Sequence, residues 1–161
     1  MVIALALFGA ACGSSSPSSS ANSSGVANTT SQVAHTKAKF VLHAGLAFGA
    51  FHRWIYKPLR SGELTHPFSH KVATLKAAVA AAFVYHELKL ALAAAQADST
   101  LSHLVAPITA LQNKMSGLGS SLKSGNVDAS QIGGANDSIA SIHELAASAG
   151  HTITEQTPSN L

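Results

Sequence analysis

The chain has 161 residues, of which 47% are hydrophobic and only 11% are charged, with a net charge of +3, nine histidines and one cysteine. This length is typical of one domain, and the apolar content suffices for a core. A single cysteine excludes an internal disulfide, and the GxSxG, P-loop and GxGxxG motifs of hydrolases and nucleotide-binding proteins are absent.

The first eleven residues form a short apolar segment that ends at the cysteine. The run VIALALFGAA has the length of a signal-peptide core and is too short to cross a bilayer as a helix. Gly9, Ala10 and Ala11 precede Cys12 directly, and small side chains there let a peptidase approach the backbone closely. Residues 1–11 are therefore predicted to be a signal-peptide-like segment.

The stretch LFGAAC followed by GSSSPSSS resembles the lipobox and tether of bacterial lipoproteins. This resemblance implies that the Cys12 thiol is acylated and that the chain is cut just before it. It also implies that the lipid holds the mature chain on the outer face of the bacterial cell membrane. The alternatives are an ordinary signal peptide with an unrelated cysteine, or a frayed N-terminus.

Residues 12–31 contain no large apolar side chain except Val26. Such a stretch cannot bury enough surface to offset the entropy lost on ordering. The sequence therefore predicts a flexible tether with a reach of roughly 25 Å between Cys12 and the folded part.

Residues 32–150 repeat apolar side chains at helical spacing and predict an all-α fold, a small four-helix bundle of two antiparallel hairpins. No segment alternates apolar and polar residues over strand length. The tail, residues 151–161, is predicted to be loose. The four helices are expected at about 32–57, 70–97, 99–124 and 128–149.

The first predicted helix has one apolar face and ends at Pro58, because proline disfavours helix at the residue before it. Gly45 and Gly49 form a GxxxG pattern on the far side, which indicates a close helix crossing or a chance match. The apolar face consists of Val33, Phe40, Ala44, Ala47, Phe51 and Trp54.

The second predicted helix, with Ser69 as its N-cap, is apolar on two sides, which is usual for a central helix. Val84, Leu88 and Leu92 lie on one side, among alanines. The other side is the larger, and its middle position, His86, is predicted to be buried and neutral. That larger side consists of Val72, Leu75, Val79, Phe83, His86 and Leu90.

The third and fourth predicted helices carry matching heptad seams and should form a hairpin. Pro107 lies inside the third, so a kink or a helix restart is expected there. Asp128 is the predicted N-cap of the fourth, with Gln131 three residues on, and Leu145 or Ala146 completes its seam. The third seam consists of Leu101, Leu104, Ile108, Leu111, Met115, Leu118 and Leu122.

His43 and His86 are the candidate ligands of a haem or a divalent metal. If the first two helices pair antiparallel, both histidines lie at similar depths, and facing imidazoles in a bundle can bind iron or another metal. The simpler interpretation is that each ring is hydrogen-bonded within the core and binds nothing.

The segment FHRWIYKPLR, residues 51–60, is the candidate membrane-surface contact. It alternates aromatic rings with cations, and both kinds of side chain favour an anionic membrane interface. In the alternative interpretation, Trp54 belongs to the core and the cations cover the helix end. The contact would involve Arg53, Trp54, Tyr56, Lys57 and Arg60.

Charge is distributed unevenly along the chain. Residues 13–97 carry eight Lys or Arg against two Glu, whereas residues 98–161 carry two Lys against five acids. Either the two parts attract each other, or the basic part faces an anionic lipid or polymer. Basic runs interleaved with glycine, typical of nucleic-acid binders, are absent, so no nucleic-acid partner is expected.

Together these patterns predict a membrane-anchored envelope lipoprotein that is not an enzyme. Its helical domain is expected to bind an envelope protein or polymer, and no cofactor is expected. The alternative is a small helical haem- or metal-binding protein that uses His43 and His86. A chain with two membrane spans is a third option, which the charges of the second helix disfavour.

Overall fold

The computed structural model describes residues 24–66 and 69–159, and every regular element in those ranges is a helix. The predicted signal-like segment, Cys12 and the first part of the predicted tether lie outside the described residues. The elements are α1 (Ser24–Phe51), the π-helical turn η1 (His52–Tyr56), α2 (Lys57–Arg60), α3 (Lys71–Ala97), the 3₁₀ turn η2 (Ser99–Leu104), α4 (Val105–Lys123) and α5 (Ala129–Ser148).

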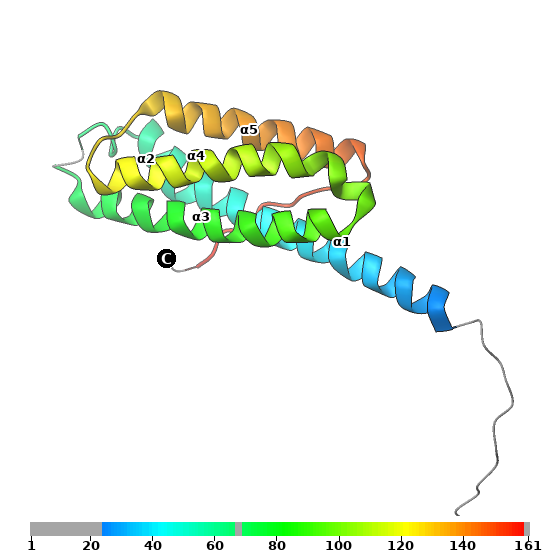
Figure 1. Cartoon of the computed structure of the whole chain (residues 1–161). Coiled ribbons are helices and arrows are strands. Elements are labelled where there is room, and N and C mark those ends of the chain that lie inside the picture. The colour runs from blue at the N-terminus through cyan, green and yellow to red at the C-terminus, as the bar shows by residue number, and fades with distance from the viewer. Residues whose placement is uncertain (1–23, 67–68, 160–161) are drawn as a thin grey trace, which may run out of the picture.

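The four long helices pack as two antiparallel hairpins, which confirms the predicted all-α bundle. α3 runs back along α1, α4 runs back along α3, and α5 runs back along α4 (Figure 1). α3 packs extensively against both α1 and α4. The first turns of α1 project beyond the other helices (Figure 1).

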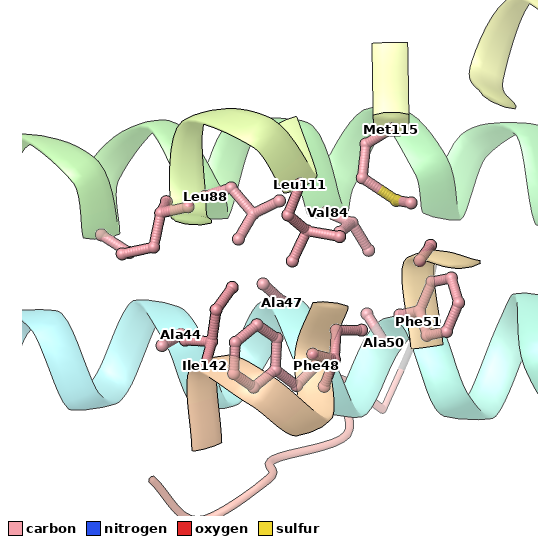
Figure 2. Close-up of a cluster of buried hydrophobic side chains, with 14 of the residues drawn as sticks. Ala44, Ala47, Phe48, Ala50, Phe51, Val84, Leu88, Leu111, Met115 and Ile142 are labelled. Carbon is pink, nitrogen blue, oxygen red and sulfur yellow. The ribbon is translucent and has the colours of Figure 1, made fainter. Parts of the chain in front are cut away.

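The core lies where the four helices meet. Figure 2 shows Val84 and Leu88 of α3 with Leu111 of α4 opposite the alanines and phenylalanines of α1, and Ile142 of α5 beside Phe48. Phe48 and Leu88 are fully buried. Small alanines on α1 let the neighbouring helices approach closely, so the larger side chains fill the centre.

α1 begins at Ser24, within the stretch predicted to be a tether. The predicted boundary at residue 32 is therefore too late. Extending an existing helix adds one hydrogen bond for each residue that is ordered, which costs much less than starting a helix. The long helix that follows can thus extend backwards into a segment that has no apolar side chain larger than valine.

The sequence predicted that the helical segment ends at Pro58. In the structure Pro58 lies in the first turn of α2, and the helical segment continues past it. A proline inside a helix lacks an N–H, and its ring clashes with the carbonyl of the preceding turn. The chain widens into η1 directly before it, where the Lys57 N–H bonds to the His52 carbonyl. This wider turn carries the helix past the proline.

Of the two apolar sides predicted for α3, only the one with Val84 and Leu88 is buried, and the prediction for the other side is wrong. Val72, Leu75 and Val79 are 68%, 66% and 46% exposed, and His86 is exposed as well. The buried side is the one that carries Leu88 and the alanines. Its fully or nearly buried members are Ala77, Ala78, Ala80, Ala81, Val84, Leu88, Ala91, Ala94 and Ala95.

The N-cap of α3 also differs from the prediction. The cap position is occupied by His70 rather than Ser69, and it makes no side-chain capping hydrogen bond. The Thr74 N–H bonds to the His70 carbonyl, as expected for the first helical turn. Among the described residues, the cap residue of α3 thus supplies no side-chain oxygen of the kind that usually satisfies a helix N-terminus.

The seam predicted for the α4–α5 hairpin is confirmed. All seven large apolar residues of the η2–α4 seam are buried, and in α5 Ala146 rather than Leu145 completes the seam. The helix restarts just before Pro107: η2 ends at Leu104 and α4 begins at Val105. Pro107 therefore lies in the first turn of α4, where the missing N–H costs little.

Two aspartates cap the elements of this second hairpin. The Asp98 carboxylate accepts hydrogen bonds from the Thr100 N–H at 2.9 Å and the Thr100 hydroxyl at 2.8 Å. Asp128 accepts from the Ser130 N–H at 2.8 Å, at the start of α5 as predicted. Burial opposes ionisation of Asp98, but the Thr100 hydrogen bonds outweigh it and lower the pKa of Asp98.

Replacing Asp98 by asparagine should flatten the acid side of the stability curve. A pKa lowered by folding contributes stability above the unfolded value of about 3.9, and this contribution is lost as pH falls through the folded pKa. Asparagine still caps a helix but does not titrate. Urea melts at pH 7 and pH 3 should show a smaller loss for Asp98→Asn than for the unchanged protein. An equal loss in both proteins would contradict the proposed role.

The C-terminal segment is held against α1, contrary to the predicted loose tail. Ile153 is buried, and the Gln156 N–H bonds to the Gly45 carbonyl at 3.0 Å. A Cβ on Gly45 or Gly49 would overlap the carbonyls of Thr154 and Gln156. The GxxxG pair therefore admits an extended chain segment rather than a helix.

Candidate functional site

A hollow of about 610 Å³ opens between η1, α2 and the first turn of α3. Trp54 lies in its wall, and we call it the Trp54 pocket. Glu63 contributes an acidic side chain, whose carboxylate accepts a hydrogen bond from the Ser61 hydroxyl. The cations of the lining are Arg53, Lys57, Lys71 and Lys76, and all four are exposed.

The Trp54 indole is contacted by cations from two helical segments. The Arg53 guanidinium lies 5.0 Å from the ring centroid and the Lys76 ammonium 5.6 Å from it. Both distances are within the range of cation–π attraction. The indole Nε1 is buried and has no hydrogen-bond partner among the described residues. Trp54 thus lines the pocket with its ring, whereas its Nε1 atom is shielded from solvent.

The start of α3 adds positive potential to the same pocket. Lys71, Val72 and Ala73 of its first turn line the pocket, and His70 supplies no side-chain cap. A helix N-terminus carries a partial positive charge, because its first N–H groups have no partner within the helix. Four cations and this helix end therefore make the pocket suitable for an anionic group.

The structure places the five predicted membrane-surface residues in different environments. Arg53, Trp54 and Lys57 line the Trp54 pocket together. Tyr56 instead stacks against Phe51, at 6.3 Å between ring centroids. Arg60 is exposed but does not line the pocket.

The contribution of α3 to this pocket was not predicted from the sequence. Lys71, Val72 and Lys76 lie more than ten residues beyond Trp54 and meet it because α3 turns back along α1. The signal in the sequence was the pair of lysines at the start of the second predicted helix. The interpretation of Val72 as a core residue hid it.

A row of exposed aliphatic side chains begins at the rim of the pocket. Val72, Leu75 and Val79 follow one side of α3 at helical spacing, and we call this row the α3 apolar stripe. A second, shallower groove brings Lys123 of α4 beside Leu75. The stripe thus has lysines close to it on α3 and α4.

The structure does not bring the two candidate haem or metal ligands together. The His43 Nδ1 lies 2.7 Å from the Glu87 carboxylate, which is 7% exposed. His86 is exposed on α3. A haem or metal site on two facing imidazoles would need His86 at the place that Glu87 occupies.

A second polar cluster joins the C-terminal segment to the bundle. The His52 Nδ1 lies 2.8 Å from one Glu155 oxygen, and the His143 Nε2 lies 3.4 Å from the other. The His52 Nε2 is 3.0 Å from the Asn136 side-chain oxygen. These contacts fix the C-terminal segment beside η1 and α5.

α3 is long and apolar enough to cross a membrane by length and composition, with a mean hydropathy of 1.4 in its most apolar window. Half of that window is buried within the bundle, and a core helix passes the same test. The length and composition of α3 are therefore weak evidence for a membrane span.

Within the described ranges, no three or more His, Cys, Asp or Glu side chains are placed to hold a metal ion, the Glu155 cluster included. Comparisons of the chain with protein-family models, curated proteins and solved structures find no match.

Proposed function

We propose that this chain is a lipid-anchored protein of the bacterial cell envelope whose helical domain is a non-enzymatic binding module. The observation that carries the proposal is the α3 apolar stripe. A bundle with a complete core elsewhere leaves three branched aliphatic side chains in water on one helix. Exposed apolar surface of this kind, beside concentrated charge, is typical of an interaction site.

The surroundings of the stripe indicate the chemistry of what binds. Arg53, Lys57, Lys71 and Lys76 collect at one end of it, and Lys123 lies beside it. Such a surface attracts an anionic partner or polymer and repels a basic one. The anchor on Cys12 is supported by the resemblance of LFGAAC to a lipobox, and it would keep the domain near the membrane.

Replacing Cys12 by serine should release the protein from the membrane fraction of the cells that make it. Without the thiol no acyl chain can be attached, and lipidation supplies about 0.8 kcal/mol of membrane affinity for each buried CH₂ group. The measurement is fractionation after a high-salt wash, which screens electrostatic contacts of the domain with the membrane but does not release an acyl anchor, followed by detection in the membrane and the soluble or secreted fractions. Ser14→Cys in the Cys12→Ser background is the control. Membrane retention of Cys12→Ser equal to that of the unchanged protein would refute the anchor.

A further inference from the structure

We infer that the α3 apolar stripe and the Trp54 pocket together dock onto an anionic phospholipid surface, with a lipid phosphate group in the pocket. This inference rests on the proposed anchoring, which would place the domain beside such a surface. Beyond the proposed anchoring, the inference names the binding partner, the face of the bundle that contacts this partner and the residues that make the contact.

The charges favour an anionic surface over a second copy of the chain. Two copies that met through the same stripe would bring lysine-rich surfaces together: Lys71 and Lys76 at one end, and Lys89 further along. Like charges brought together in this way oppose association. The acid of α3, Glu87, is buried against His43 and cannot offset them. An anionic lipid surface neutralises the same cations.

The geometry of the bundle allows this docking to be flat. An interfacial helix lies in the membrane plane, with its apolar side chains in the boundary between headgroups and acyl chains. The stripe runs along the axis of α3, and α1 runs antiparallel beside α3 (Figure 1). In the docked position α1 therefore also lies along the membrane. Its first residue, Ser24, is only twelve positions from the proposed lipid on Cys12.

The Trp54 pocket offers a lipid headgroup concentrated positive charge. Arg53 and Lys76 approach the indole within 5.0 and 5.6 Å, so cations of η1 and α3 surround one small volume. Lys57 and Lys71 line the same pocket and add two further exposed cations for a phosphate. Indole rings also favour the interfacial region of a bilayer. Val72 lines the pocket as well and is the first residue of the α3 apolar stripe, so the pocket and the stripe are continuous.

The test uses the full chain with Cys12→Ser, so that no lipid is attached, and vesicles of phosphatidylglycerol or of phosphatidylcholine. Trp54 is the single tryptophan of the chain, so its fluorescence reports on the pocket alone. We expect phosphatidylglycerol vesicles with brominated acyl chains to quench it, and phosphatidylcholine vesicles to have little effect. The apolar segment of residues 1–11 is present in every sample, so its own contribution to vesicle binding is constant. The conclusion therefore depends on the differences between vesicles and between variants.

Two variants with the same change of charge separate the proposed surface from a general attraction. Lys76→Glu should weaken binding to phosphatidylglycerol vesicles by about 10- to 30-fold, since each lysine near an anionic surface contributes about a factor of five and reversal adds repulsion. Lys114→Glu changes the net charge equally on the α4–α5 hairpin and should weaken binding far less. Leu75→Asn removes apolar contact and should also weaken binding. Circular dichroism must show an intact fold in each case.

Three kinds of result would overturn the inference, the first of which can appear in either of two comparisons. The first is equal binding to both kinds of vesicle, or equal losses in Lys76→Glu and Lys114→Glu. The second is a response of Trp54 to inorganic phosphate alone that matches the response to vesicles, which would indicate an anion site without a membrane surface. The third is no binding at all. Each would leave the anchor untouched, because fractionation of Cys12→Ser measures the anchor separately.

Discussion

Leu88→Ala should lower the free energy of unfolding by about 2–5 kcal/mol, whereas Leu75→Ala should change it by no more than about 0.5 kcal/mol. Both substitutions remove the same atoms from the same helix. Only the surroundings differ: Leu88 is fully buried and Leu75 is 66% exposed. The pair therefore tests which side of α3 faces the core.

The expected loss at Leu88 has two causes. Its side chain lies between α1 and α4, near Leu111 (Figure 2), so truncation returns no buried surface to water but leaves a cavity among rigid neighbours. The lost transfer free energy and the lost packing contacts add together. At Leu75 the solvent fills the space that the side chain leaves.

Urea denaturation of the two variants and the unchanged protein, at one pH, gives both differences. Comparable losses in the two variants would mean that α3 buries both sides. A larger loss for Leu75→Ala would mean that the side of α3 with Leu75 is the buried one. Leu75→Ala has a second use, because an unchanged stability makes any loss of vesicle binding attributable to the surface.

The packing of the α4–α5 hairpin was predictable because the large apolar residues of each helix lie almost entirely on one face. Leucines, isoleucines and one methionine recur every three or four positions, and serine, asparagine and glycine occupy the other sides. Only one face of each helix can therefore be buried. The structure buries that face throughout.

α3 has two apolar faces in sequence, and both were predicted to be buried, whereas the structure buries only one. Val72, Leu75 and Val79 are larger than the alanines opposite, so a count of apolar surface selects them. The bundle selects the alanines, because small side chains let α3 approach α1 and α4 closely enough for Val84 and Leu88 to fill the centre. Hydrophobic periodicity does not contain this information about the neighbouring helices.

The candidate site was predictable only where its residues are adjacent in the sequence. Arg53, Trp54 and Lys57 fall within one turn of helix, so their grouping could be predicted from spacing. Lys76 reaches Trp54 through the reversal of the chain between α2 and α3. Glu87 reaches His43 in the same way, and a pairing of that kind depends on the register of two helices.

The effect of adding a methyl group should have opposite signs at two glycines. Gly49→Ala should lower the free energy of unfolding by about 1–3 kcal/mol, the usual cost of overpacking. Gly117→Ala should raise it by about 0.5–1 kcal/mol, because glycine inside a helix loses more backbone entropy on folding than alanine. The glycines differ in their surroundings: a Cβ on Gly49 meets the Gln156 backbone, and one on Gly117 meets no atom within 4 Å.

The loss at Gly49 should appear first in the C-terminal segment. The methyl group would push the Gln156 backbone away from α1, which would break its hydrogen bond to Gly45 and expose Ile153. Urea denaturation measures the two stabilities, and cleavage at Glu155 by a glutamate-specific protease measures release of the segment. Gly49→Ala should be cleaved faster than the unchanged protein, and Gly117→Ala should not. If Gly49→Ala were as stable and as resistant as Gly117→Ala, the C-terminal segment would not be seated on α1.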